Sequence, residues 1–341
     1  MSLIEFTDCG LYCRAGDFYI DPWKPVDRAV ITHGHSDHAR WGSRVYFCHH
    51  DTKPILQLRL GPNQYQTAGW NEPVYMNGVR VSLHPAGHII GSSQIRIEHE
   101  GEVWVVSGDY KTENDGISGQ FEPVKCHTFI TESTFGLPIY KWKPQAEIYT
   151  GIKSWIQKNR NEGKTSVLFA YSLGKAQRIL QPIAEVCDTI LTHGAVYNMH
   201  TTLEAAGWKL PAVHRVTHDT PKDLLKGNVV IAPSSAEGTA WIRKFAPYSI
   251  GVCSGWMQVR GAVRRRNADA GFVLSDHADW AGLLSAVKAT EAECVYATHG
   301  FQSAFSRYLT EQGMDAREVK TEYGGEKELS IEPTDINEII S

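Results

Sequence analysis

The sequence contains no long hydrophobic run, which limits where the protein can act. A helix that spans a bilayer needs about 20 consecutive apolar residues, and no segment of the chain approaches that length. The first eight residues include Glu5 and Asp8 and have neither a basic start nor a long apolar stretch, unlike a secretory signal. We therefore expect a cytoplasmic protein with no membrane partner.

Cysteine is scarce. The 341 residues include 7 cysteines, and an odd, scattered set does not form a disulfide framework in so large a chain. Cys9 and Cys13 form a close pair, but no second pair stands at the spacing of a zinc site. The sequence predicts reduced thiols in packed segments.

An excess of basic charge is also absent. Lys and Arg number 34 against 38 Asp and Glu, which gives a net charge of −4 and excludes a polybasic coat that binds nucleic acid indiscriminately. A local basic groove remains compatible with this balance. Histidine, by contrast, occurs 15 times, and it is the commonest metal ligand in proteins.

Short apolar strands end at polar residues in both outer thirds of the chain, whereas the middle alternates strands with helical periodicity. The first pattern indicates a sheet scaffold with an active site along one edge, and the second indicates a parallel sheet flanked by helices. We expect a split core of residues 1–139 and 268–341 with an inserted domain of residues 140–267. The expected helices cover residues 146–159, 173–187, 237–245, 280–289 and 303–312.

The strongest local motif is H-G-H-S-D-H at residues 33–38, directly after an apolar strand. On a tight loop His33 and His35 can converge on one metal, while Asp37 and His38 turn toward a second. Imidazole and carboxylate are ligands that Zn²⁺ and Mn²⁺ accept. A surface polyhistidine run fits poorly, because Gly and Ser separate the ligand residues.

This motif resembles the H-x-H-x-D-H signature of the metallo-β-lactamase superfamily, and further matches follow along the chain. Asp21 stands where the family places a supporting aspartate. His88, in P-A-G-H, matches the third metal-site histidine, and Asp109, in S-G-D, matches the aspartate between two metals.

Three later segments narrow the resemblance to the β-CASP nucleases. They are T-E-S-T-F-G with Glu132, S-D-H-A-D with His277 and T-H-G with His299. Ordinary lactamase-fold thioesterases and lactamases lack these motifs and the large insert. The chain is identified as a member of this family, which implies an α/β fold with a metallo-β-lactamase αββα sandwich core and an inserted β-CASP α/β domain.

The resemblance implies two divalent metal ions, Zn²⁺ or Mn²⁺, that activate water and neutralise phosphodiester oxygens. His277 would contact the scissile phosphate or protonate the leaving oxygen, and Glu132 would orient it. Each residue alone has an ordinary alternative, such as a turn aspartate at 109 or a core histidine at 88, and the order of the motifs outweighs these alternatives. The implied metal ligands are His33, His35 and His88 for one ion, Asp37, His38 and His299 for the other, and Asp109 between them; the implied catalytic residues are Asp37, Asp109, Glu132 and His277, with Asp21 in support.

Four residues are candidates for contact with nucleic acid. Ser172 and Lys175 open a predicted helix, whose N-terminus favours phosphate. Ser234 follows a strand of the insert, and Arg260 belongs to a local basic cluster with three further arginines. A solvated helix residue or a solvated edge would explain the same charges.

The substrate is argued from the resemblance. Family members with His at the position of His299 act on RNA. By contrast, the sequence around His88 and Glu132 resembles that of bacterial DNA ligase-associated exonucleases. No RNA-binding domain is evident in the sequence, which also favours DNA. We expect a DNA exonuclease that acts from a 5′ end in repair or end processing, alongside a DNA ligase and a helicase. The alternatives are an RNA-processing nuclease and a non-nuclease, thioesterase-like hydrolase.

Overall fold

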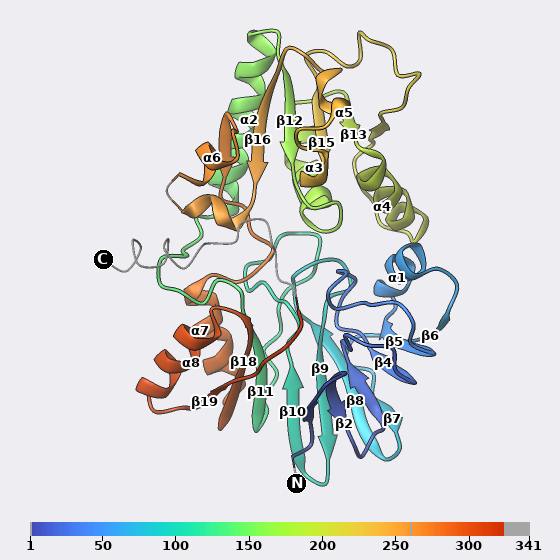
Figure 1. Cartoon of the computed structure of the whole chain (residues 1–341), viewed down its shortest axis with the longest axis vertical. Coiled ribbons are helices and arrows are strands. Elements are labelled where there is room, and N and C mark those ends of the chain that lie inside the picture. Colours follow the sequence, from blue (N-terminus) through green and yellow to red (C-terminus); the bar gives the residue numbers. More distant parts are fainter. Residues whose placement is uncertain (1, 260, 324–341) are drawn as a thin grey trace.

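The chain folds into two lobes in this computed structural model, which describes residues 2–259 and 261–323. The lower lobe in Figure 1 contains two β-sheets, and the upper lobe contains a third sheet with its own helices. The seven cysteines all fall within the described residues and are free thiols, as the sequence predicts. No helix of the described part is both long and apolar enough to cross a membrane.

The first sheet of the lower lobe has six strands in the order of the chain, β1 to β6. Its first three strands form an antiparallel meander, and β3 to β6 run parallel to their neighbours. The strands are β1 (Glu5–Thr7), β2 (Gly10–Cys13), β3 (Phe18–Ile20), β4 (Arg28–Val30), β5 (Val45–His49) and β6 (Gln64–Ala68).

The second sheet of this lobe has the strand order β19-β18-β11-β10-β9-β8-β7. Strands β7 to β10 form an antiparallel meander, whereas β10, β11, β18 and β19 are parallel. Residues far apart in sequence therefore meet at one end of this sheet. The strands are β7 (Val74–Met76), β8 (Val79–Pro85), β9 (Ser93–His99), β10 (Glu102–Val106), β11 (Thr128–Ser133), β18 (Cys294–Gly300) and β19 (Asp315–Glu318).

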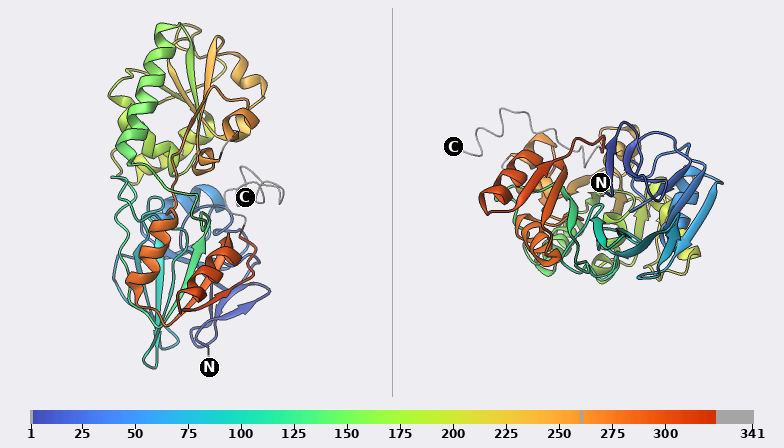
Figure 2. Two further views of the ribbon diagram at one scale, coloured as in Figure 1. Left: turned by 90° about the vertical axis from the view of Figure 1, so that its left-hand side faces the viewer. Right: turned by 90° about the horizontal axis from the view of Figure 1, so that it is seen from below.

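The two sheets pack face to face around one hydrophobic core. Leu11 and Phe18 of the first sheet share an apolar cluster with Ile95 and Ile97 of the second. Helix α1 (Thr52–Leu60) covers the outer face of the first sheet, and α7 (Trp280–Thr290) and α8 (Gln302–Glu311) cover the outer face of the second (Figure 2). This helix-sheet-sheet-helix order confirms the predicted metallo-β-lactamase sandwich.

The sandwich core predicts a large cost for one truncation. Leu11→Ala is expected to lower the free energy of unfolding by about 2–5 kcal/mol, because the side chain is fully buried between the sheets and a cavity would remain. Urea unfolding followed by tryptophan fluorescence measures this loss. Leu58→Ala is the matched control, since Leu58 is 43% exposed on α1 and Ala favours helix. Equal losses in the two variants would contradict the proposed core.

The upper lobe is built on a parallel sheet of order β14-β13-β15-β12-β16-β17. Helices α2 (Gln145–Asn161) and α3 (Lys175–Ala184) pack on one face, and α5 (Ala240–Arg243) and α6 (Ala262–Arg265) on the other. The predicted boundary at residue 267 precedes β17, which pairs with β16 and extends this sheet to Phe272. The strands are β12 (Thr165–Phe169), β13 (Ile190–Thr192), β14 (His214–Arg215), β15 (Val229–Ala232), β16 (Tyr248–Cys253) and β17 (Ala270–Phe272).

The insert packs against the core through two apolar clusters. Helix α4 (Gly194–Ala205) packs against α1, where Met199 and Leu203 join Ile55 in one buried cluster. A second cluster, around Phe135 and Trp256, lies where the chain passes between the lobes. The insert is therefore fixed to the core on two sides.

The two segments that cross between the lobes are tied to each other. The Trp142 backbone N–H donates to Asp279 Oδ2 at 3.0 Å, and its indole Nε1–H donates to the His277 carbonyl at 3.0 Å. The chain thus enters and leaves the insert side by side.

The helices differ from the sequence prediction in four places. Helix α5 covers Ala240–Arg243, less than the predicted 237–245, because a 3-10 turn at Ser234–Ala236 and a left-handed Gly238 precede it. Helices α1, α4 and α6 have no counterpart among the predicted helices. The buried positions Val196, Met199 and Leu203 of α4 do stand at helical spacing, so a signal for that helix was present.

Candidate metal centre

The candidate site lies at one edge of the core, where several strands end. The 32–38 loop follows β4, His88 follows β8 and Asp109 follows β10, while Glu132 and His299 lie in the last residues of β11 and β18. Because these strands end at the same edge, the five segments converge there. The predicted motifs are thus brought together by the topology of the two sheets.

The turn before Asp109 requires glycine. Gly108 has φ +55°, and a Cβ at this position would lie 2.7 Å from Thr32 Cβ. This close approach places Asp109 against the loop that begins at Thr32. The S-G-D motif is therefore a local requirement of the backbone as well as a source of the carboxylate.

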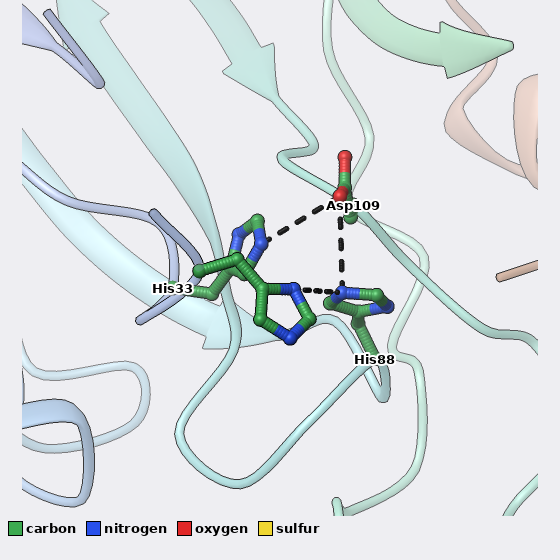
Figure 3. Close-up of side chains that lie close together, drawn as sticks. His33, His88 and Asp109 are labelled. Atoms are coloured by element: carbon green, nitrogen blue, oxygen red, sulfur yellow. Dashed lines mark hydrogen bonds and ion pairs between the residues drawn. The ribbon is translucent and has the colours of Figure 1, made fainter. Parts of the chain in front are cut away.

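His33, His35, His88 and Asp109 form the first candidate metal group. His33 Nε2 and His88 Nε2 lie 3.6 and 3.7 Å from Asp109 Oδ2, and both face it (Figure 3). His35 Nδ1 lies 3.0 Å from His88 Nε2. Ligand atoms from three separate segments thus surround one point.

His38, Asp109 and His299 form the second candidate group. Asp109 Oδ1 lies 2.9 Å from His299 Nε2 and 3.4 Å from His38 Nε2. Asp37 Oδ2 lies 3.8 Å from His38 Nε2, at the rim of this group. Since Oδ2 of Asp109 faces the first group and Oδ1 the second, Asp109 lies between the two.

Asp21 holds the histidine loop from the buried side. It accepts hydrogen bonds from the backbone N–H and the hydroxyl of Thr32 and from His38 Nδ1, which lies 2.7 Å from Oδ2. The Asp21 backbone has φ +42°, a left-handed conformation that aspartate tolerates better than most residues. The bond to Nδ1 turns Nε2 of His38 toward Asp109.

The electrostatics of the site favour a cation. Burial holds the pKa of His33 and His88 well below the ordinary value, so both rings are neutral and able to bind a metal. Burial also lowers the pKa of His38, but the carboxylates of Asp109, Asp37 and Asp21 outweigh it and raise that pKa to about 10. The negative field that keeps a proton on His38 is the field that a divalent cation would meet.

The ligand atoms themselves test whether a metal fits. Among the described residues, His33 Nε2 and His38 Nε2 are buried and have no hydrogen-bond partner, and the buried His299 Nε2 and Asp109 Oδ1 face each other at 2.9 Å. Buried polar atoms without partners are costly and need an explanation. Imidazole nitrogens and carboxylate oxygens that converge in this way suit Zn²⁺ or Mn²⁺, so the residues fit a pair of divalent ions.

His277 and Glu132 form a buried pair beside the metal groups. His277 Nδ1 lies 2.9 and 3.0 Å from the two Glu132 oxygens, and Glu132 also accepts from the Tyr110 backbone N–H at 2.7 Å. The His277 ring lies 4.5 Å from the His88 ring. Glu132 therefore fixes the ring of a histidine at the edge of the site.

The four residues predicted to contact nucleic acid lie in different environments. Ser172 and Ser234 are partly exposed at the ends of β12 and β15, near the core. Lys175 is fully buried, with its ammonium 3.3 Å from Asp276, so the structure gives no support to a phosphate contact there. Arg260 lies outside the described residues.

Two features of the site carry no signal in the sequence. Tyr323 stacks on His38 with ring centroids 4.5 Å apart, although it is distant from every motif. Arg178, on α3, forms an ion pair with Asp276 beside His277. Both depend on tertiary contacts that local patterns do not encode.

Asp21→Asn tests whether the contact of Asp21 with His38 stabilises the second metal group. Loss of the carboxylate is expected to weaken binding of one divalent ion about 10- to 100-fold, because partners of a metal-binding histidine contribute that much. Titration with Zn²⁺ and a competing chelator measures it. The matched control is Asp17→Asn, since Asp17 also has positive φ but is exposed and far from the motifs. Unchanged affinity in Asp21→Asn would contradict the assigned role.

Comparison with known proteins places these residues in a family. A protein named "Probable DNA ligase" from Opitutus terrae is 30% identical over 311 residues, covering 90% of this chain and 30% of that protein. Endoribonuclease YSH1 of Yarrowia lipolytica is 27% identical over 191 residues, 46% of this chain and 23% of its own. An RNase J-like protein of Methanocaldococcus jannaschii is 22% identical over 200 residues, 51% of this chain and 47% of its own.

The ordered motifs, the sandwich core and these relatives together decide the family. The chain belongs to the β-CASP family of metallo-β-lactamase-fold nucleases. This β-CASP chain spans less than half the length of each relative named above. No protein-family model matches it.

A solved structure shares the fold of this β-CASP chain. A protein of unknown function from Enterococcus faecalis V583 superposes with a TM-score of 0.56 at 12% identity, over 87% of this chain and 80% of that one. At this identity the likeness shows the fold alone.

Proposed function

We propose that this β-CASP nuclease is a metal-dependent DNA exonuclease that acts from a 5′ end during repair or end processing. The observation that carries the proposal is the relative from Opitutus terrae, which matches 90% of this chain and is named a DNA ligase. Only 30% of that protein is matched, so the nuclease-like segment there accompanies a larger remainder. A ligase joins DNA ends, and a nuclease beside it would prepare them.

The same reasoning supplies the proposed partners. A DNA ligase would receive the trimmed end, and a helicase would expose the strand to be trimmed.

The site supports phosphodiester hydrolysis. Two divalent ions bound here would activate water and neutralise charge on the phosphate. Glu132 accepts a hydrogen bond from Nδ1 of His277 and so fixes the ring. Held in this way, His277 is placed to contact the phosphate or to protonate the leaving oxygen.

RNA is the second candidate substrate. YSH1 of Yarrowia lipolytica is named an endoribonuclease, and the Methanocaldococcus protein is named RNase J-like. The resemblance also associates His at position 299 with family members that act on RNA. These observations favour RNA but come from alignments over about half of this chain.

One experiment separates the two substrates. The purified chain is incubated with Mn²⁺ and matched single-stranded DNA and RNA of one sequence, each labelled at either the 5′ or the 3′ end. We expect DNA to be shortened progressively from its 5′ end and RNA to be cut more slowly. Faster cleavage of RNA would overturn the DNA assignment, and internal products from DNA would overturn exonucleolytic action.

A further inference from the structure

A buried cluster of three charges joins the insert to the core. Lys175 and Arg178 lie on α3 of the insert, and Asp276 lies in the core segment between β17 and α7. Lys175 Nζ is 3.3 Å from Asp276 Oδ2, and Arg178 Nη1 is 2.9 Å from Asp276 Oδ1. All three residues are at most 3% exposed. Charges buried this deeply are stable only when they remain paired, so the cluster fixes the relative position of the two segments.

Close packing reinforces the same junction. Arg178 Nη2 also donates to the Ser275 carbonyl at 2.8 Å. Gly174, just before α3, has φ +88°, and a Cβ there would lie 2.4 Å from Ile89 Cγ2. The start of α3 therefore lies directly against the loop that carries His88.

The joined segments hold two histidines of the first metal group. His35 Nε2 donates to the carbonyl of Leu173, 3.3 Å away in the insert, and His88 Nδ1 donates to the carbonyl of Asp276 at 2.8 Å. A carbonyl can only accept, so these bonds leave His35 Nδ1 and His88 Nε2 with lone pairs toward the metal position. Both ring orientations thus depend on the cross-domain cluster.

The second metal group is held by the core. His38 Nδ1 bonds to Asp21, and His299 Nδ1 lies 3.2 Å from the Thr298 hydroxyl, which donates to the Thr131 carbonyl. Asp21, Thr131 and Thr298 all belong to the two-sheet lobe. The two metal positions therefore differ in how far they depend on the insert.

We propose that Lys175, Arg178 and Asp276 are positioning residues for the His33–His35–His88 group, so that docking of the insert sets the affinity of one metal position and leaves the other to the core. This inference rests on the proposed metal-dependent function. It assigns the inserted domain a role in assembling the metal centre.

Zinc content of the full-length chain tests the proposal. Lys175→Met and Asp276→Asn are loaded with Zn²⁺ alone and dialysed against a graded series of chelator concentrations. We expect one ion to be lost with an affinity about 10- to 100-fold weaker than in the unsubstituted chain, and the second ion to be retained. His299→Ala added to Lys175→Met is expected to remove the remaining ion.

The control is Lys153→Met on α2, which breaks a surface ion pair between Lys153 and Glu185 and should hold both ions normally. Folding is followed by circular dichroism and thermal melting. Asp276→Asn keeps the size of the side chain and its hydrogen-bond acceptor, and it carries the test if Lys175→Met does not fold.

The outcomes separate this inference from the proposed function. A folded variant that holds both ions as tightly as the unsubstituted chain overturns the inference, and so does parallel loss of both ions. An unsubstituted chain that binds no Zn²⁺ and no Mn²⁺ overturns the metal centre itself. A chain that binds two ions but cuts no nucleic acid overturns the proposed function and leaves the positioning role standing.

Discussion

Asp109→Ala is expected to reduce phosphodiester cleavage by at least about a thousandfold, beyond the 100- to 1,000-fold typical of losing one stabilising group. The two Asp109 oxygens face different metal groups, so the substitution would remove a ligand from both. The substitution would also leave the four buried histidines that face Asp109 close to one another without the carboxylate that they share. We therefore expect metal content to fall together with activity, measured on the same preparation by end-labelled cleavage and elemental analysis.

Asp27→Ala is the matched control for Asp109. Asp27 pairs with Arg44 at the surface and is remote from the site, so activity and metal content should stay near normal. A folded Asp109→Ala protein with two bound metals and full activity would remove the central assignment of the site.

His277→Ala is expected to lower turnover about 100- to 10,000-fold, the range for loss of a positioned proton donor. The ring is held by Glu132 and packs against Phe135, and it lies outside the His33–His35–His88–Asp109 group and the His38–Asp109–His299 group. Metal content should therefore stay near two ions per chain, and the loss should appear in kcat more than in KM. Steady-state kinetics and elemental analysis together measure both quantities.

His127→Ala provides the control for His277, since His127 is exposed and bonds to the Val103 backbone N–H far from the motifs. Loss of both metals in His277→Ala would show that His277 is a metal ligand rather than a proton donor. Full activity would show that its pairing with Glu132 is only structural.

The site could be predicted from the sequence where its residues stand close together in one motif. The motif at residues 33–38 concentrates its ligands in one loop, and the later motifs follow apolar strands in family order. Parallel strands β10, β11 and β18 then bring their ends together, so order in sequence becomes proximity in space. The arrangement of Asp109, Glu132 and His299 follows from this topology.

The rest depends on contacts that sequence patterns do not contain. Lys175 has the appearance of a solvated helix residue, yet it is buried because Asp276, about 100 positions later, offers a partner. Tyr323 reaches His38 only through the return of the chain after β19. Short strands such as β14 have too few residues to show a period.

The paired crossing between the lobes has a mechanical consequence. Since Trp142 is hydrogen-bonded to the His277 carbonyl and to the Asp279 carboxylate, the segment that enters the insert also holds the backbone that carries His277. A substitution at Trp142 would therefore act on the position of His277 without touching any candidate metal ligand.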